Sequence, residues 1–253
     1  MRLRIRFTKQ GKVRFTSHRD VARIWERTLR RVALPVARSQ GFSPRPKVHF
    51  GLALPTGYES LAEYLDVDLV EGTRVDPATL PAPLTAALPG GLAATAAAEV
   101  DPRAPSLQHA VTSSRWEIEV TGLDLPTLEA RCEDLLAAPE LVMARQRKGK
   151  DVSDDVRPHL FHLQPTAPVD GGALLIAELG TLGRALRPRE LVALLGDGAG
   201  EGKVCRTHQF TEHDGTRSEP LTPLAAAAPA AAPGPVSPAD HPSPAPHAEA
   251  RAS

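Results

Sequence analysis

Four arginines near the N-terminus recur at the spacing of an α-helix. Steps of four, four and three residues place side chains on one helix face. The residues at these positions are Arg19, Arg23, Arg27 and Arg30, with Arg31 beside them. Because a guanidinium group can bind two phosphate oxygens at once, the row predicts a binding surface for a polyanion such as RNA. Two alternatives stay open: a solvated basic face, or pairing of these arginines with the acidic segment 59–71.

A histidine and a carboxylate stand at the start of the same helix, in the run Ser17-His18-Arg19-Asp20. A helix N-terminus offers free N–H groups and the positive end of the dipole to an anion, and an imidazole can transfer a proton near neutral pH. His18 and Asp20 are therefore candidate catalytic residues, which Glu59 or Asp155 could assist. The alternative is that Ser17 and Asp20 only cap the helix and that His18 is a surface residue.

The loop 39–47 is rich in turn-forming residues and presents Phe42, Arg45 and Lys47 next to Gly41. An aromatic ring beside cations can stack and hold the bases of a single strand, so these three side chains are candidate RNA contacts. The alternative is a structural loop in which Phe42 packs into the core.

A second group of basic residues lies in the middle of the chain. Its members are Arg147, Lys148, Lys150 and Arg157. On a functional loop they would add cations to a binding cleft; at the tip of a hairpin they would form only a solvated turn.

The charge of the chain is unevenly distributed. Residues 1–50 contain 11 Arg and three Lys against only Asp20 and Glu26, a net charge of +12, whereas the whole chain is neutral. Such asymmetry is a further indication of a polyanion-binding surface.

The sequence lacks the motifs that are typical of several classes of enzyme. The sequence contains no dinucleotide-binding, P-loop, zinc-protease or nucleophile-elbow motif, and its nine histidines lack metal-ligand spacing, so we expect neither a cofactor nor a metal. Cys132 and Cys205 are too few for a disulfide framework. The N-terminus has no signal-peptide pattern and no apolar run reaches about 18 residues, so we expect a cytoplasmic protein without membrane contact.

Hydrophobic periodicity predicts alternating strands and helices. Strands are expected at 2–8, 47–54, 61–70, 91–100, 116–120, 140–147, 156–163, 173–179 and 203–211, and helices at 17–32, 77–88, 124–138 and 188–195. Val13 and Phe15 are expected to continue a hairpin after a turn at 9–12. The fold class is therefore α+β, with helices on one face of antiparallel sheets, arranged as two ferredoxin-like β-α-β-β-α-β halves.

The predicted elements divide the chain into three regions: a first half with the basic helix at 1–105, a second half at 106–213, and a tail at 214–253. Residues 220–253 contain 12 Ala and 9 Pro in 34 positions, which leaves too little apolar surface to offset the entropy of ordering. We expect this Ala/Pro-rich tail to be disordered.

Several runs of the first 70 residues are similar to one known family. The runs are Phe15–Asp20, Arg27–Pro35, Gly41–Lys47, Leu54–Ser60 and Glu63–Asp66. They resemble the radical-SAM-linked domain of unknown function, here in its stand-alone form, which elsewhere follows a cobalamin-binding radical SAM enzyme in one chain. The resemblance implies an accessory role beside a separate radical SAM enzyme. A radical SAM cluster needs three closely spaced cysteines, and this chain has two cysteines that are far apart in sequence.

The leading hypothesis is an accessory module, not itself an enzyme, that binds RNA and positions it for a modifying or processing partner. A second hypothesis is a protein-interaction module whose basic face docks on an acidic partner. A third is a stand-alone enzyme that uses His18 as acid or base. The duplicated pattern is also similar to that of pseudouridine synthases, but the chain has no Gly-Arg-Thr-Asp segment, so that activity is not expected.

Overall fold

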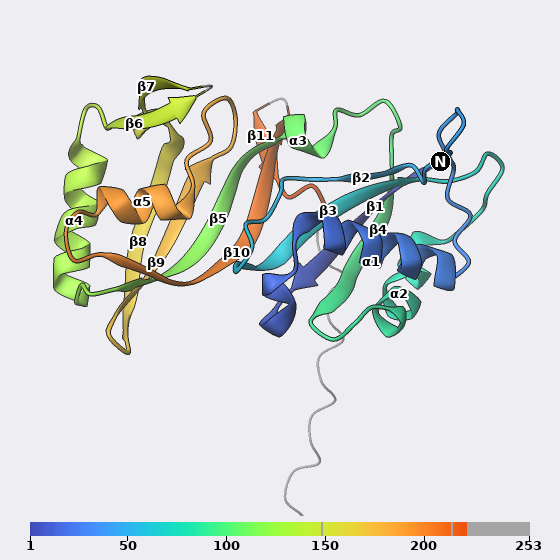
Figure 1. The fold of residues 1–253 in the computed structure, drawn as a ribbon, viewed down its shortest axis with the longest axis horizontal. Helices are drawn as coiled ribbons and strands as arrows, with labels where there is room; N and C mark the ends of the chain where they lie inside the picture. The colour runs from blue at the N-terminus through green and yellow to red at the C-terminus, as the bar shows by residue number, and fades with distance from the viewer. Residues whose placement is uncertain (148, 214, 222–253) are drawn as a thin grey trace, which may run out of the picture. The chain divides into compact units, whose positions relative to one another are not determined.

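The structure is a computed structural model that describes residues 1–147, 149–213 and 215–221. Within these residues, nine strands form one sheet in the order β4-β1-β3-β10-β5-β9-β8, with β2 on β3 and β11 on β10, and two further strands form the separate hairpin β6–β7 (Figure 1). The strands are β1 (Arg2–Lys9), β2 (Val48–Phe50), β3 (Glu59–Asp68), β4 (Leu92–Val100), β5 (Val111–Thr121), β6 (Val142–Arg147), β7 (Lys150–Asp155), β8 (Leu160–Val169), β9 (Gly172–Gly180), β10 (Gly200–His213) and β11 (Thr216–Ser218).

Five α-helices and three short 3-10 helices accompany the strands of the described residues. They are α1 (His18–Arg31), α2 (Pro81–Ala87), α3 (Leu107–Ala110), α4 (Leu125–Ala137), α5 (Pro188–Leu194), η1 (Gly11–Phe15), η2 (Pro77–Thr79) and η3 (Arg157–His159). The α+β class and the largely antiparallel sheet predicted from the sequence are confirmed.

The alternating apolar residues of β1 form part of one of the hydrophobic cores. Leu3, Ile5 and Phe7 are buried in a cluster that contains Trp25 and Leu29 of α1. Side chains of successive strand residues point to opposite faces, so the arginines of β1 face the other side of the sheet. On that side Arg4 and Arg6 are buried, so these arginines do not form a solvent-exposed cationic face.

Helix α1 owes its position to its cap and to its apolar stripe. The hydroxyl of Ser17 accepts a hydrogen bond from the N–H of Asp20 at 3.2 Å, which satisfies one of the free donors of the first turn. Val21, Trp25 and Leu29 face the core. The helix therefore presents its opposite face to solvent.

The second half repeats the strand connections of the first. Across the sheet, the strands of the first half lie in the order β4-β1-β3-β2 and those of the second half in the order β10-β5-β9-β8. Within each half, neighbouring strands are antiparallel. Between α4 and β8 the second half carries the additional hairpin β6–β7. These orders are compatible with two ferredoxin-like halves, an assignment that stays a prediction, as do the region boundaries at 105 and 213.

The two halves meet at a short parallel junction. β3 and β10 pair only at Glu59–Cys205 and Ser60–Arg206. Beside the junction, the guanidinium of Arg206 donates to the carboxylate of Glu63, with Nη2–Oε1 at 2.6 Å, and both residues are buried. Two core clusters lie on the helix-covered side, one under α1 and α2 and one under α4 and α5.

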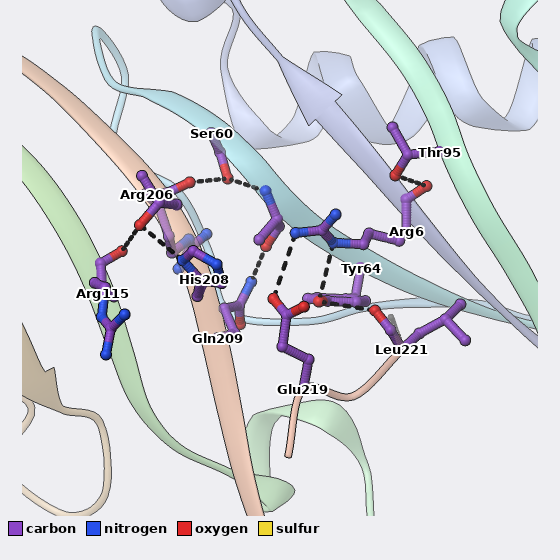
Figure 2. Close-up of polar contacts among 12 residues, drawn as sticks. Arg6, Ser60, Tyr64, Thr95, Arg115, Arg206, His208, Gln209, Glu219 and Leu221 are labelled. Atoms are coloured by element: carbon purple, nitrogen blue, oxygen red, sulfur yellow. Dashed lines mark hydrogen bonds and ion pairs between the residues drawn. The ribbon is translucent and has the colours of Figure 1, made fainter. Parts of the chain in front are cut away.

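The end of the described chain is held against the sheet. Figure 2 shows Arg6 between the hydroxyl of Tyr64 and the carboxylate of Glu219, while Tyr64 donates to the carbonyl oxygen of Leu221 at 3.3 Å. β11 and these contacts fall within the segment 214–253 that the sequence analysis assigned to the tail. The remainder of the expected tail, together with residue 214, lies outside the described residues.

Three local expectations differ from the structure. Residues 11–15 form η1 instead of a strand, because Gly11 has a positive φ of 67° and the N–H of Thr16 bonds back to Val13. The strand expected at 156–163 begins only at Leu160, because Pro158 lies within the turn η3. The strand expected at 47–54 is limited to β2.

Candidate nucleic-acid interface

The five arginines of α1 lie on its exposed side. Arg19, Arg23, Arg27, Arg30 and Arg31 are all exposed, while the stripe on the other side is buried. The helix thus has the two-faced form that its spacing predicted.

Two of these arginines have partners. The guanidinium of Arg23 lies 3.2 Å from the carboxylate of Asp20, and Nη1 of Arg31 donates to the carbonyl oxygen of Ala87 at 2.9 Å. The guanidinium groups of the other three make no hydrogen bond or ion pair with any described residue; they belong to Arg19, Arg27 and Arg30. Their charge is therefore available to an external anion.

The acidic segment 59–71 does not neutralise this face. Within the described residues, four of its carboxylates pair with cations of β1 and β10. Asp68 pairs with Arg2 at 2.6 Å, Asp66 with Arg4 at 2.8 Å, Glu63 with Arg206 at 2.6 Å, and Glu59 with Lys203 at 3.1 Å.

The loop 39–47 carries Phe42 at its tip. The loop is closed by two hydrogen bonds between Ser39 and Arg45, one of which joins the N–H of Ser39 to the carbonyl oxygen of Arg45 at 2.9 Å. Gly41 adopts a φ of 121°, which favours glycine. The ring of Phe42 is fully exposed, and Arg45 and Lys47 of the same loop are exposed as well. The ring lies in solvent, where it can accept a stacking partner.

The loop and the helix share one surface. A groove of about 100 Å³ lies between them, with Glu26, Leu29 and Arg30 of α1 on one side and Val36, Arg38 and Pro46 on the other. The structure therefore brings the C-terminal half of the arginine row next to the base of the aromatic loop.

One protein family accounts for most of the chain. Its family model matches residues 2–188, and it is described as "Uncharacterized protein conserved in bacteria (DUF2344)". The chain belongs to this family. The description names no ligand, reaction or radical SAM link.

The other comparisons add little to this assignment. No match was found among curated proteins. A chain of a crystal structure of a Cbf5–Nop10–Gar1 complex is similar with a TM-score of 0.46 and 13% identity, over 82% of this chain and 48% of the other. This DUF2344 chain thus spans about half the length of that protein, and a similarity this distant carries no argument here.

The candidate acid–base residues do not converge in this DUF2344 protein. The ring of His18 is exposed and packs edge-on against Phe50, with the ring centroids 5.4 Å apart. A hydrogen bond from the Ser17 hydroxyl and the nearby Arg23 lower the pKa of Asp20. No hydrogen bond or ion pair among the described residues joins His18 to Asp20, Glu59 or Asp155.

Glu59 and Asp155 instead hold backbone N–H groups. Although burial acts to raise it, the pKa of Glu59 is lowered by the N–H of Gly11 and by Lys203. The carboxylate of Asp155 accepts hydrogen bonds from the N–H groups of Leu141 and Arg157 at 2.8 and 2.9 Å, which lower its pKa. These contacts favour structural roles.

The second basic group lies in the other half of the protein. Figure 1 shows the β6–β7 hairpin beside α4 and α5, whereas α1 lies over β1, β3 and β4. The guanidinium of Arg157 donates to three carbonyl oxygens, those of Leu136, Ala138 and Leu160. Lys150 is exposed; the side chain of Arg147 and all of Lys148 lie outside the described part of the chain. This group shares no described contact with α1, and its anion-binding role stays a prediction.

Sequence reasoning did not single out two buried cations. Nζ of Lys9 donates to the carbonyl oxygens of Arg14 and Thr16, and burial lowers its pKa. Arg206 pairs with Glu63, which is 143 positions away in sequence. Neither belongs to a periodic pattern, so only the three-dimensional arrangement reveals their partners.

No described helix is long and apolar enough to cross a membrane. The described residues also contain no group of three or more His, Cys, Asp or Glu side chains placed to hold a metal ion.

Proposed function

We propose that this DUF2344 protein binds single-stranded RNA on the α1 face and on the loop that carries Phe42. The observation that carries the proposal is the exposed row Arg19, Arg27 and Arg30. Their guanidinium groups make no hydrogen bond or ion pair with the described residues, while the carboxylates of β3 pair with other cations.

Electrostatics favours an anion on this face. Arginines three or four positions apart on a helix repel one another, and a bound phosphate backbone would relieve that repulsion. Neutralising phosphates also releases condensed counterions, which makes the affinity steeply dependent on salt.

The loop that carries Phe42 would contribute base stacking in addition to the electrostatic attraction of α1. Base–aromatic stacking is sequence-tolerant and contributes about 1–3 kcal/mol per base, and Phe42 has its whole ring available. Arg45 and Lys47 are exposed in the same loop and would hold the flanking phosphates. The proposed interface therefore contacts the phosphate backbone and stacks on an unpaired base, without specificity for the RNA sequence.

The role of the bound RNA belongs to the same proposal. As an accessory module, the protein would present the RNA to a separate modifying or processing enzyme, and the resemblance noted above implies a radical SAM enzyme. Such an enzyme should co-purify in an RNase-sensitive manner. A stoichiometric protein partner that survives nuclease treatment would instead favour direct docking on the basic face.

The test is fluorescence anisotropy of a labelled, unstructured RNA at about 50 and 200 mM salt. Each phosphate contact to a single strand contributes about 0.7 to the salt slope. Five cations would therefore weaken binding about a hundredfold over this range; they are Arg19, Arg27, Arg30, Arg45 and Lys47. In the Arg27→Gln/Arg30→Gln variant the remaining three should give only about a twentyfold loss.

The control removes the same charge elsewhere. Arg74 and Arg103 are exposed and lie outside α1 and the loop, so Arg74→Gln/Arg103→Gln should retain the wild-type salt slope. Equal slopes in the two double variants, or no binding at the lower salt, would overturn the proposal.

A further inference from the structure

A cavity of about 150 Å³ lies apart from the α1 surface, between the segment that follows β2 and the β9–α5 loop. Its floor is formed by Ser114, Trp116, Leu179 and Arg206, all of which are buried. Its rim includes the exposed residues Ala53 and Arg187. The cavity is therefore open to solvent at one end and closed by the sheet at the other.

The floor holds a polar group without a partner. The hydroxyl oxygen of Ser114 is fully buried, the residue is only 1% exposed, and the oxygen makes no hydrogen bond. Buried polar side chains in native proteins are nearly always satisfied. A hydroxyl can both donate and accept, so a ligand that enters the cavity with a polar edge would complete this group.

The chemistry of the remaining wall suits an aromatic ring. The guanidinium of Arg206 lies over the ring of Trp116 at 5.2 Å and is fixed there by Glu63 and by the carbonyl oxygen of Leu52. Leu179 adds an apolar surface to the same floor. A cavity of about 150 Å³ is large enough for a six-membered aromatic ring.

We propose that this cavity binds one nucleobase, with the polar edge of the base on the hydroxyl of Ser114 and the attached phosphate near Arg187 at the rim. The base comes either from an unstacked position of bound RNA or from a free nucleotide. The first source rests on the proposed RNA-binding function, whereas the second does not.

The first experiment uses free nucleotides. Saturation-transfer NMR is recorded with each of the four ribonucleoside 5′-monophosphates at millimolar concentration. At least one should show transfer that is strongest at the protons of the base. The Ala185→Leu variant, which fills the cavity, should abolish this transfer, and Ala193→Leu on the exposed side of α5 should retain it.

A second variant keeps the test independent of packing. Ser114→Ala removes only a hydroxyl that has no partner, so the fold should be maintained, and the loss of one hydrogen bond should weaken nucleotide binding by about tenfold. Thermal unfolding of each variant verifies that it is folded.

The RNA arm distinguishes the two sources. If Ala185→Leu lowers RNA affinity as well, the base comes from the strand; if it abolishes only nucleotide binding, the ligand is a free nucleotide. The absence of base transfer for all four nucleotides, together with an unchanged RNA affinity in Ala185→Leu, would overturn the nucleobase site. That result would leave RNA binding by α1 intact, because the Arg27→Gln/Arg30→Gln variant tests it separately.

Discussion

Replacing Arg4 by methionine removes one half of an ion pair buried between β1 and β3. Nε and Nη2 of Arg4 lie 2.8 and 2.9 Å from the two carboxylate oxygens of Asp66, and the two side chains are only 9% and 4% exposed. Removing one partner leaves an uncompensated buried charge, which typically costs about 3–5 kcal/mol. A pair in solvent would cost only about 0.2–1 kcal/mol. The structure therefore predicts a loss in the upper range for Arg4→Met.

Urea unfolding monitored by tryptophan fluorescence measures this loss, because Trp25 and Trp116 report on the two cores. Arg2→Met serves as the control, since the pair between Arg2 and Asp68 is about 20% exposed and should cost less. The double variant Arg4→Met/Asp66→Leu should recover much of the stability, because it leaves no unpaired charge. A loss below about 1 kcal/mol for Arg4→Met would refute a dry ion pair, as would a double variant that is no more stable than the single one.

Three further variants or reagents test local features. Ser17→Ala should lower the free energy of unfolding by about 1 kcal/mol, because the N-cap of α1 is lost; an unchanged urea midpoint would contradict this. Asp155→Asn should be less stable than wild type above about pH 4, and the difference should shrink as the pH falls through the lowered pKa of the folded-state carboxyl. A difference in unfolding free energy that is independent of pH would be the opposite result. Burial raises the pKa of Cys132 to about 12, so about one molecule in ten thousand is ionised at pH 8, and a thiol reagent should modify this residue only after unfolding.

Periodicity was sufficient to predict the elements that have one apolar face. In α1 the same spacing that buries Val21, Trp25 and Leu29 leaves Arg19 and Arg27 in solvent. Burial on one side decides both the helix and the orientation of its charges, so the surface of α1 could be predicted from local sequence alone.

Partner choice could not be predicted in the same way. The arginines of β1 have the same chemistry as those of α1, yet the guanidinium of Arg4 forms a buried ion pair with Asp66. The difference depends on the register between β1 and β3, which aligns Arg4 with Asp66 across the sheet. Cross-strand contacts of this kind depend on non-local pairing, which no local pattern encodes.

The residues on the floor of the cavity could not be predicted from the sequence either. Ser114 and Arg206 are unremarkable strand residues in sequence, and they line one cavity only because β5 and β10 are neighbours in the sheet. By contrast, the exposed position of Phe42 could be anticipated as one of two alternatives, because glycine and proline surround it in a turn-rich loop.

The short junction between β3 and β10 has a consequence for how the chain folds. Apart from the pair of β10 and β11, every other strand pair of the main sheet joins segments of the same half, whereas this junction links positions that are 146 residues apart. Closing so long a loop carries an entropic cost, which the two backbone pairs and the side-chain contacts beside them offset only when both strands are already in place. We therefore expect each half to acquire its strands early and the junction to form last, together with the ion pair of Glu63 and Arg206.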